Sequence, residues 1–456
     1  MKKATVFLYA FGSVFVSSIA GLLFGFDLVV ISGALSFIAK EFYIVPDQLV
    51  LKELIISAVP AGALLGALFS AYFGQIIGRK YSIVLTAIIF SIGTLVVVYA
   101  WSVDTIIIGR IIKGFAVGLS ATVVPIYLAE ISTPKMRGTL VFLYQLAITL
   151  GIALGFFINH VFHENCGWRE MFFVAIIPSL LLCLGMMLLP ESPSWLISRN
   201  RLEAAKRSLR KLKGVANNDL EIKKIKNLLN YGKGSFFLLF SKNLRPLALV
   251  SISLFLFQQL TGINSIFYYA PTIFDAAGIT NSTIASMSTG SIFVFATVIG
   301  VFLIDRVGRR ILLLVGTFGI ATCQFLQGVA LQQYFPINVC ALISIISALI
   351  AISFYAFSIT GIAYIIMSEI FPLSIRSYGT SLASCANWGM NMVVAATFLS
   401  LNSIMGIGGT FLLYAFITFL GFIFIYYFVP ETKGVALEHI EEKIYAGVRV
   451  RYLGRS

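Results

Sequence analysis

The stretch GQIIGRK, residues 74–80, has a counterpart 230 residues later in DRVGRR, residues 305–310. Two further pairs accompany it: AEISTPKMRG (129–138) matches SEIFPLSIRS (368–377), and PESPSW (190–195) matches PETKG (430–434), at offsets of 239 and 240 residues. Offsets that agree this closely indicate that one structural unit is written twice along the chain. The repetition decides the fold, because each copy must supply one half of it.

The segments between these motifs are long apolar runs. Hydrophobic residues make up 59% of the 456 residues and charged residues only 11%, which excludes an ordinary soluble domain. A run of about 20 residues can cross a bilayer, and in lipid it must be helical because its backbone groups have no other partners. We predict twelve such runs, at 6–32, 53–73, 81–101, 105–130, 139–161, 170–189, 245–270, 283–304, 311–332, 337–367, 377–402 and 409–429.

The runs divide the chain into four parts. We expect an N-terminal six-helix bundle at 1–190, a cytoplasmic linker with amphipathic helices at 191–243, a C-terminal six-helix bundle at 244–430 and a cytoplasmic tail at 431–456. Of the 33 Lys and Arg residues, 28 fall on the side that holds both termini, so the positive-inside rule places both termini in the cytoplasm. The first run has no small-residue cleavage site and is predicted to be retained.

The net charge of +14 does not require a nucleic-acid partner. Its densest basic segment, RLEAAKRSLRKLKG at 201–214, fits a cytoplasmic helix lying on an anionic leaflet. The five cysteines show no metal-binding or disulfide spacing, and the three histidines fall at helix ends or in the tail. With no nucleophile or phosphate-binding motif present, we predict neither an enzyme nor a metal or cofactor site.

A set of motifs, in order, gives the chain a family resemblance. They are GFDLVVISGA (25–34), GRIIKGFAVG (109–118), PIYLAEISTPKMRG (125–138), PESPSWL (190–196), QQLTGIN (258–264), DRVGRR, SEIFP (368–372), NWGMN (387–391) and PETKG. The chain resembles the sugar porters of the major facilitator superfamily over nearly its full length. The resemblance implies twelve membrane helices in two six-helix halves and alternating access around a central site. We expect function as a monomer. The compact loops, the lack of a targeting segment and the short tail favour a bacterial inner membrane as the location.

Charged residues at the cytoplasmic ends of the helices are candidates for a latch. Carboxylates lie at the ends of some helices and guanidinium groups lie at the starts of the next helices, so bidentate pairs can form there. The resemblance implies that such pairs hold the outward-facing state; the alternative is that these charges only set topology. The predicted latch residues are Glu130, Arg137, Glu191, Asp305, Arg309, Arg310, Glu369, Arg376 and Glu431.

A sugar site inside a membrane should hold amides and aromatic rings, because sugar hydroxyls need donors and acceptors while the ring face packs on an aromatic. QQLTGIN supplies Gln258, Gln259 and, beyond a flexible Thr-Gly pair, Asn264. The alternative for these amides is polar contact between helices. The resemblance adds Gln145 and the positions now occupied by Tyr364, Asn387, Trp388, Asn391 and Phe293, with Phe24, Tyr268 and Tyr269 as lining or gating aromatics.

Three of these positions depart from the family pattern. Tyr364 replaces a tryptophan, Asn387 replaces a glutamine and Phe293 replaces an asparagine. Loss of a hydrogen-bonding group discriminates strongly between substrates. The preferred sugar, a hexose or a pentose, therefore need not be glucose or xylose, and a polyol such as myo-inositol is an alternative.

Asp27 is a carboxylate inside an apolar run, which marks it as functional. Arg110, inside the fourth run, is its candidate partner, and a buried carboxylate beside a guanidinium can change proton occupancy when its partner or its access to water changes. The resemblance implies that Asp27 accepts the proton of a sugar–proton symporter and Arg110 gates it. The alternatives are a permanent structural pair and a facilitative uniporter. Lys113, three residues beyond Arg110, is a second cation that could compete for Asp27.

Overall fold

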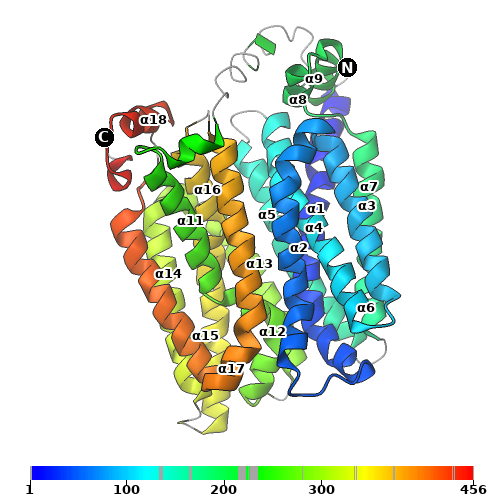
Figure 1. The fold of residues 1–456 in the computed structure, drawn as a ribbon, viewed down its shortest axis with the longest axis vertical. Coiled ribbons are helices and arrows are strands. Elements are labelled where there is room, and N and C mark those ends of the chain that lie inside the picture. The colour runs from blue at the N-terminus through cyan, green and yellow to red at the C-terminus, as the bar shows by residue number, and fades with distance from the viewer. Residues whose placement is uncertain are drawn as a thin grey trace.

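The structure is a computed structural model. It describes residues 3–132, 137–163, 167–213, 222–223, 225, 235–279, 281–332, 334, 336–372, 375–433, 435 and 437–454. Within these ranges the regular elements are all helices, arranged as two bundles side by side (Figure 1).

The N-terminal bundle is formed by the elements drawn from blue to green-cyan in Figure 1. These are α1 (Lys3–Glu41), α2 (Leu49–Ile76), α3 (Arg79–Val98), α4 (Val103–Ile131), α5 (Arg137–Phe162), α6 (Trp168–Phe173) and α7 (Ile176–Leu188). Small residues bring α2 and α4 into backbone contact: a Cβ on Gly62 would lie 2.1 Å from the Ile111 carbonyl oxygen, and one on Gly118 would lie 2.0 Å from that of Ala63. Such close approach is how membrane helices gain packing energy without a hydrophobic driving force.

The linker contributes α8 (Pro193–Ser198), α9 (Leu202–Lys213) and the 3-10 helix η1 (Phe236–Phe240). The C-terminal bundle holds α11 (Arg245–Leu260), α12 (Ile263–Ala276), α13 (Ser282–Val307), α14 (Arg309–Leu331), α15 (Ile337–Phe357), α16 (Ile359–Ile370) and α17 (Arg376–Phe428). The tail adds α18 (Leu437–Tyr445) and η2 (Val450–Tyr452). Both termini lie at the same end of the molecule, together with α8, α9 and α18 (Figure 1).

Element α17 contains 53 residues, which as a straight helix would be about 80 Å long, far more than a bilayer of about 30 Å. It is not straight, because Gly406 has φ +72° and ψ 162°, outside the helical region. Figure 1 shows α17 descending in orange and returning in red-orange. The predicted runs 377–402 and 409–429 are its two arms.

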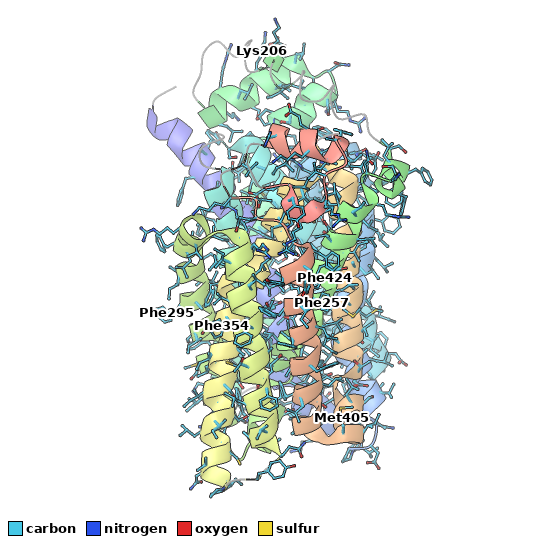
Figure 2. All side chains as sticks on the ribbon, turned by 90° about the vertical axis from the view of Figure 1, so that its left-hand side faces the viewer. Lys206, Phe257, Phe295, Phe354, Met405 and Phe424 are labelled. Carbon is cyan, nitrogen blue, oxygen red and sulfur yellow. The ribbon has the colours of Figure 1, made fainter. Side chains whose placement is uncertain are left out.

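By length and composition, eleven helices within the described residues could cross a membrane, and α17 is counted once among them. Each predicted run falls on helix, although three are split between successive helices: α6 and α7, α11 and α12, and α15 and α16. Phe295 projects outward from the side of the bundle, whereas Lys206 lies at the end with the termini and Met405 at the opposite end (Figure 2). The apolar flank and polar end suit a bilayer-spanning chain.

Candidate functional site

The amides predicted from QQLTGIN meet at a break between two helices. Helix α11 ends at Leu260 and α12 begins at Ile263, with Gly262 between them at φ +68°. The break lets residues on both sides turn toward α17: Gln259 donates to the Asn387 side-chain oxygen at 2.7 Å and accepts from Asn391 at 2.9 Å. Asn264 donates to the same Gln259 oxygen at 2.6 Å. Interrupted membrane helices commonly form substrate sites in this way.

Gln258 and Gln145 stand apart from that network. Gln258 is buried, and its side-chain oxygen has no hydrogen bond of good geometry within the described part of the chain, although the Tyr355 hydroxyl lies nearby. Gln145 is half-buried on α5, a helix that packs against α13 of the C-terminal bundle. The unsatisfied Gln258 oxygen is a ready acceptor for a hydroxyl group.

Aromatic rings surround the amides from both bundles. Phe24 of α1 lies 5.3 Å from Trp388 of α17, measured between ring centroids, so these two rings meet across the interface. Tyr364 keeps 37% of its surface exposed, and its hydroxyl lies 3.5 Å from the Asn387 amide nitrogen. The hydroxyl of Tyr364 therefore borders the amide network.

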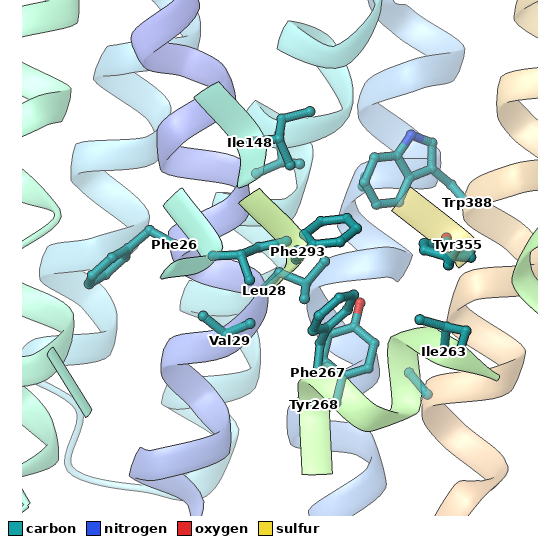
Figure 3. Close-up of a cluster of buried hydrophobic side chains, with 14 of the residues drawn as sticks. Phe26, Leu28, Val29, Ile148, Ile263, Phe267, Tyr268, Phe293, Tyr355 and Trp388 are labelled. Carbon is teal, nitrogen blue, oxygen red and sulfur yellow. The ribbon is translucent and has the colours of Figure 1, made fainter. Parts of the chain in front are cut away.

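Phe293 occupies a different environment. It packs between Phe267, at 5.1 Å, and Tyr355, at 6.4 Å (Figure 3). The Phe293 ring is buried and forms the α13 side of this aromatic cluster. Apolar packing therefore fills this position.

The charged groups of the first bundle are arranged differently from the Asp27–Arg110 pair considered above. The ion pair of Asp27 is with the Lys113 ammonium, and both side chains are fully buried. Arg110 is close enough to interact electrostatically with Asp27, but its Nε donates to the Ile55 carbonyl oxygen of α2 at 2.7 Å. The structure therefore brings all three groups together and gives the direct contact to Lys113.

Tyr268 of α12 joins the two groups of residues. Its hydroxyl donates to the Asn391 side-chain oxygen at 2.9 Å, and it interacts electrostatically with Asp27 and Arg110. Figure 3 shows Tyr268 beside Phe267, close to Leu28 and Val29 of α1. The neighbouring Tyr269 donates to the Ala395 carbonyl oxygen at 3.0 Å, which fixes α12 against α17.

Glu53 is a candidate functional residue that sequence reasoning missed. It lies near the start of α2 with 2% of its surface exposed, and its carboxylate accepts from the Ser400 backbone N–H and hydroxyl, each at 2.7 Å. Because Ser400 belongs to α17, this contact joins the two bundles at the end away from the termini. The feature of the sequence that could have identified Glu53 is that it is a lone carboxylate at the start of an apolar run.

The predicted latch residues form the same arrangement twice, once in each bundle. In the first, the Arg79 guanidinium forms a bidentate pair with Glu130 at 3.0 and 3.1 Å, and Glu191 accepts from the Arg79 and Lys80 backbone N–H groups. In the second, Arg309 pairs with Glu369 at 3.4 Å and Glu431 accepts from the Arg309 and Arg310 backbone N–H groups. Each pair joins helices of one bundle, so neither ion pair holds the two bundles together in this structure. Arg79 was missed, although the 230-residue repeat aligns it with Arg309.

The remaining latch candidates are placed as follows. Arg376 donates to the Phe371 carbonyl oxygen at 3.2 Å and Arg310 to that of Tyr426 at 2.7 Å. The side chains of Arg137 and Asp305 lie outside the described part of the structure. Burial raises the pKa of Glu191, against the lowering effect of the Lys80 and Ser192 N–H donors. Burial also raises the pKa of Glu369, against the effect of Arg309.

Comparison with known proteins agrees with this architecture. The family model described as "Sugar (and other) transporter" matches residues 13–444. The arabinose-proton symporter of Escherichia coli strain K12 is 37% identical over 448 residues, covering 96% of this chain and 94% of that protein. The galactose-proton symporter of the same strain is 37% identical over 454 residues, covering 96% and 95%.

Solved structures give the same result. The xylose transporter XylE from E. coli, in a partially occluded inward open conformation, matches with a TM-score of 0.84 at 28% identity, over 94% of this chain and 99% of that one. Its inward open conformation also matches with a TM-score of 0.84. The duplicated six-helix unit, the interrupted helix with its amides and these likenesses together establish that the chain belongs to the sugar transporter family of the major facilitator superfamily.

Proposed function

We propose that this transporter carries a monosaccharide, a hexose or a pentose, together with a proton. The observation that carries the proposal is the amide network around Gln259, set at the break of α11/α12 and bordered by Trp388 and Tyr364. Amides offer donors and acceptors to hydroxyl groups without a net charge. Relatives named for arabinose, galactose and xylose transport support this class of substrate.

The proposal includes the placement of the chain. We propose twelve spans with both termini in the cytoplasm. The repeated unit, the two arms of α17 and the basic residues at the end with the termini support this placement. Bacterial symporters among the relatives support an inner-membrane location. The site lies within one chain, which supports function as a monomer.

The described contacts between the bundles support an inward-facing state. They include Glu53 with Ser400 near the end away from the termini, α1 with α12, and Phe24 with Trp388 in the middle. A matching inward open structure of XylE supports the same assignment. The sugar site would then open toward the cytoplasm.

The coupling step uses Asp27 and Tyr268. In the outward-open state Asp27 takes a proton from outside water, which removes the charge that attracts the cations of α4. Sugar bound at Gln259 and Asn391 then draws α12 toward α1, because Tyr268 contacts Asn391 and faces Asp27. Opening to the inside releases the sugar, and Asp27 returns its proton when its ion pair re-forms.

Facilitated diffusion is the second candidate function, and one observation favours it. Asp27 already has an internal cation in Lys113, and a permanent pair would need no proton. Polyol transport is a further alternative for the substrate, supported by a 34% identical relative named a probable polyol transporter of Arabidopsis thaliana.

Uptake into proteoliposomes tests the proposal. Labelled L-arabinose, D-galactose, D-xylose, D-glucose and myo-inositol are compared, with and without an inward proton gradient, in the wild type and in Asp27→Asn. We expect one or more monosaccharides to accumulate above equilibrium only with the gradient, and Asp27→Asn to retain exchange alone. Gradient-independent equilibration in both proteins would establish the facilitator, and uptake of myo-inositol alone would establish the polyol porter.

A further inference from the structure

The ion pair between Lys113 and Asp27 lies inside the N-terminal bundle. Both side chains are fully buried, and beyond this ion pair neither oxygen of the Asp27 carboxylate accepts a hydrogen bond from a described residue. The cost of burying a charge is offset only by its partners. Within the described residues, the ammonium of Lys113 is the cation in direct contact with the Asp27 carboxylate.

The lysine is accommodated by its neighbours. Gly93 of α3 leaves room for its stem, because a Cβ on that residue would lie 2.7 Å from the Lys113 Cγ. The ammonium nitrogen lies 4.6 Å from the Phe172 ring centroid and 5.0 Å from that of Phe90. Aromatic faces stabilise a desolvated cation, so the site is built to hold a charged lysine.

Arg110 is engaged elsewhere. Its Nε donates to the Ile55 carbonyl oxygen and its guanidinium lies 5.9 Å from the Phe172 ring centroid. The two terminal nitrogens make no hydrogen bond within the described residues, so the guanidinium is not directed at Asp27 in this state. The cluster thus holds two cations and one carboxylate.

The other elements packed around Asp27 add few charges. Tyr268 and Tyr269 of α12 face the cluster, and Glu53 of α2 interacts electrostatically with Tyr269. Helix α5 packs against α1 on the turns next to Asp27. There Ile152 of α5 lies against Gly25 of α1, and Gly155 of α5 lies against Val29 of α1, so these contacts add no charge. Two cations therefore oppose the neutral form of Asp27, and Lys113 is the nearer one.

We propose that Lys113 is the counter-ion of Asp27, and that Asp27 takes up a proton only when this ion pair opens. The inference rests on the proposed proton coupling. When the pair opens, a proton from water forms an O–H bond on the Asp27 carboxylate, and the ammonium keeps its own proton. When the pair closes, the carboxyl group returns that proton to water. Lys113 is thus a positioning residue that sets the pH range over which the transporter loads protons.

The test measures the carboxyl group directly and needs no sugar. Infrared difference spectra of the purified protein are recorded from pH 5 to pH 10, and the carboxylic acid C=O band of Asp27 is assigned by its loss in Asp27→Asn. In Lys113→Met, which keeps the length of the side chain without its charge, we expect the band to reach half intensity at least one pH unit higher than in the wild type. One unit is a tenfold change in proton affinity. Lys113→Gln repeats the test in case the first variant does not fold.

Two controls isolate the role of the charge. Lys113→Arg keeps a cation, so the midpoint of the Asp27 band in this variant should lie close to that of the wild type. Lys40→Met removes a charge from an exposed position at the end of α1 and should leave the band unchanged. An unchanged midpoint in both Lys113→Met and Lys113→Gln would overturn the inference. Failure of the proposed function would appear separately, as wild-type uptake that ignores a proton gradient.

Discussion

Gln259 is the residue on which the amide network depends. It contacts Asn264, Asn387 and Asn391, so its removal would leave three buried amides short of a partner. Because an unsatisfied buried polar group costs about 1–3 kcal/mol, we expect Gln259→Ala to weaken sugar binding about tenfold or more. Calorimetric titration with the transported sugar measures the effect. Gln48→Ala, at an exposed position before α2, is the control, and equal affinities in the two variants would contradict this role.

At this scale the sequence predicted residue types better than partners. Gln258, Gln259 and Asn264 were predicted as site residues because paired amides in an apolar run are costly unless they are hydrogen-bonded. The pairing of Asp27 with Lys113 was left open, since both Arg110 and Lys113 lie on α4 and only packing against α2 and α3 decides between them. Residue types follow from local chemistry, whereas partners depend on the positions of several helices.

At the scale of the element, the interruption of α11/α12 depends on a glycine. Gly262 has φ +68°, and a Cβ there would lie 2.3 Å from the Tyr414 ring. Gly406 has φ +72° with nothing within 4 Å of the same position. Gly262 is left-handed with ψ 5°, whereas Gly406, with ψ 162°, lies in a region that essentially only glycine adopts. A residue other than glycine held in either region costs about 1–3 kcal/mol, so Gly406→Ala should lower the free energy of unfolding by about that amount.

Gly262→Ala should be the more damaging of the two, because it adds the clash with Tyr414 to the same strain. It should also displace Gln259 from Asn264 and reduce sugar binding, which Gly406→Ala should leave intact. Thermal unfolding and sugar titration of both purified variants measure the difference. Equal losses of stability would mean that the clash is relieved at little cost.

The contact between α2 and α17 provides a second prediction at this scale. Glu53 accepts two hydrogen bonds from Ser400, and bonds to a charged acceptor contribute about 1.5–3 kcal/mol each. Glu53→Ala removes both, whereas Ser400→Ala removes only the hydroxyl bond. We expect both variants to open the end away from the termini, the first more than the second.

Spin labels at two exposed positions report this opening. Val50 of α2 and Ile404 of α17 are 64% and 78% exposed and lie in different bundles. Double electron–electron resonance should show a longer distance between the two labels in both variants. The population with the longer distance should be largest in Glu53→Ala. An unchanged distance distribution in both variants would show that other contacts hold the bundles together. The sequence could not reveal this contact, since 347 residues separate the two partners.

At the scale of the whole molecule, the repeat seen in the sequence returns as repeated structure. Arg79, Glu130 and Glu191 form in the first bundle the arrangement that Arg309, Glu369 and Glu431 form in the second. These groups fix helix ends within each bundle, which suits two bodies that move against each other. The residues of the proposed sites are not repeated: the buried charges Asp27, Arg110 and Lys113 lie in the first bundle and most of the amides in the second. The proposed proton site and the proposed sugar site lie in different halves, so they can be coupled only through contacts between the halves, among them that of α1 with α12.

That arrangement predicts which side of the membrane reaches the sugar site at rest. Tyr364 borders the amide network and is partly exposed, so in an inward-facing protein Tyr364→Cys should react with a membrane-impermeant thiol reagent from the cytoplasmic side only. Trp101, 82% exposed between α3 and α4 at the opposite end, should react as Trp101→Cys from the outside only. Intact cells and inside-out vesicles, in a background without the native cysteines, distinguish the two directions. Labelling of Tyr364→Cys from outside would place the resting protein in the outward-facing state, and reversed labelling of Trp101→Cys would reverse the proposed topology.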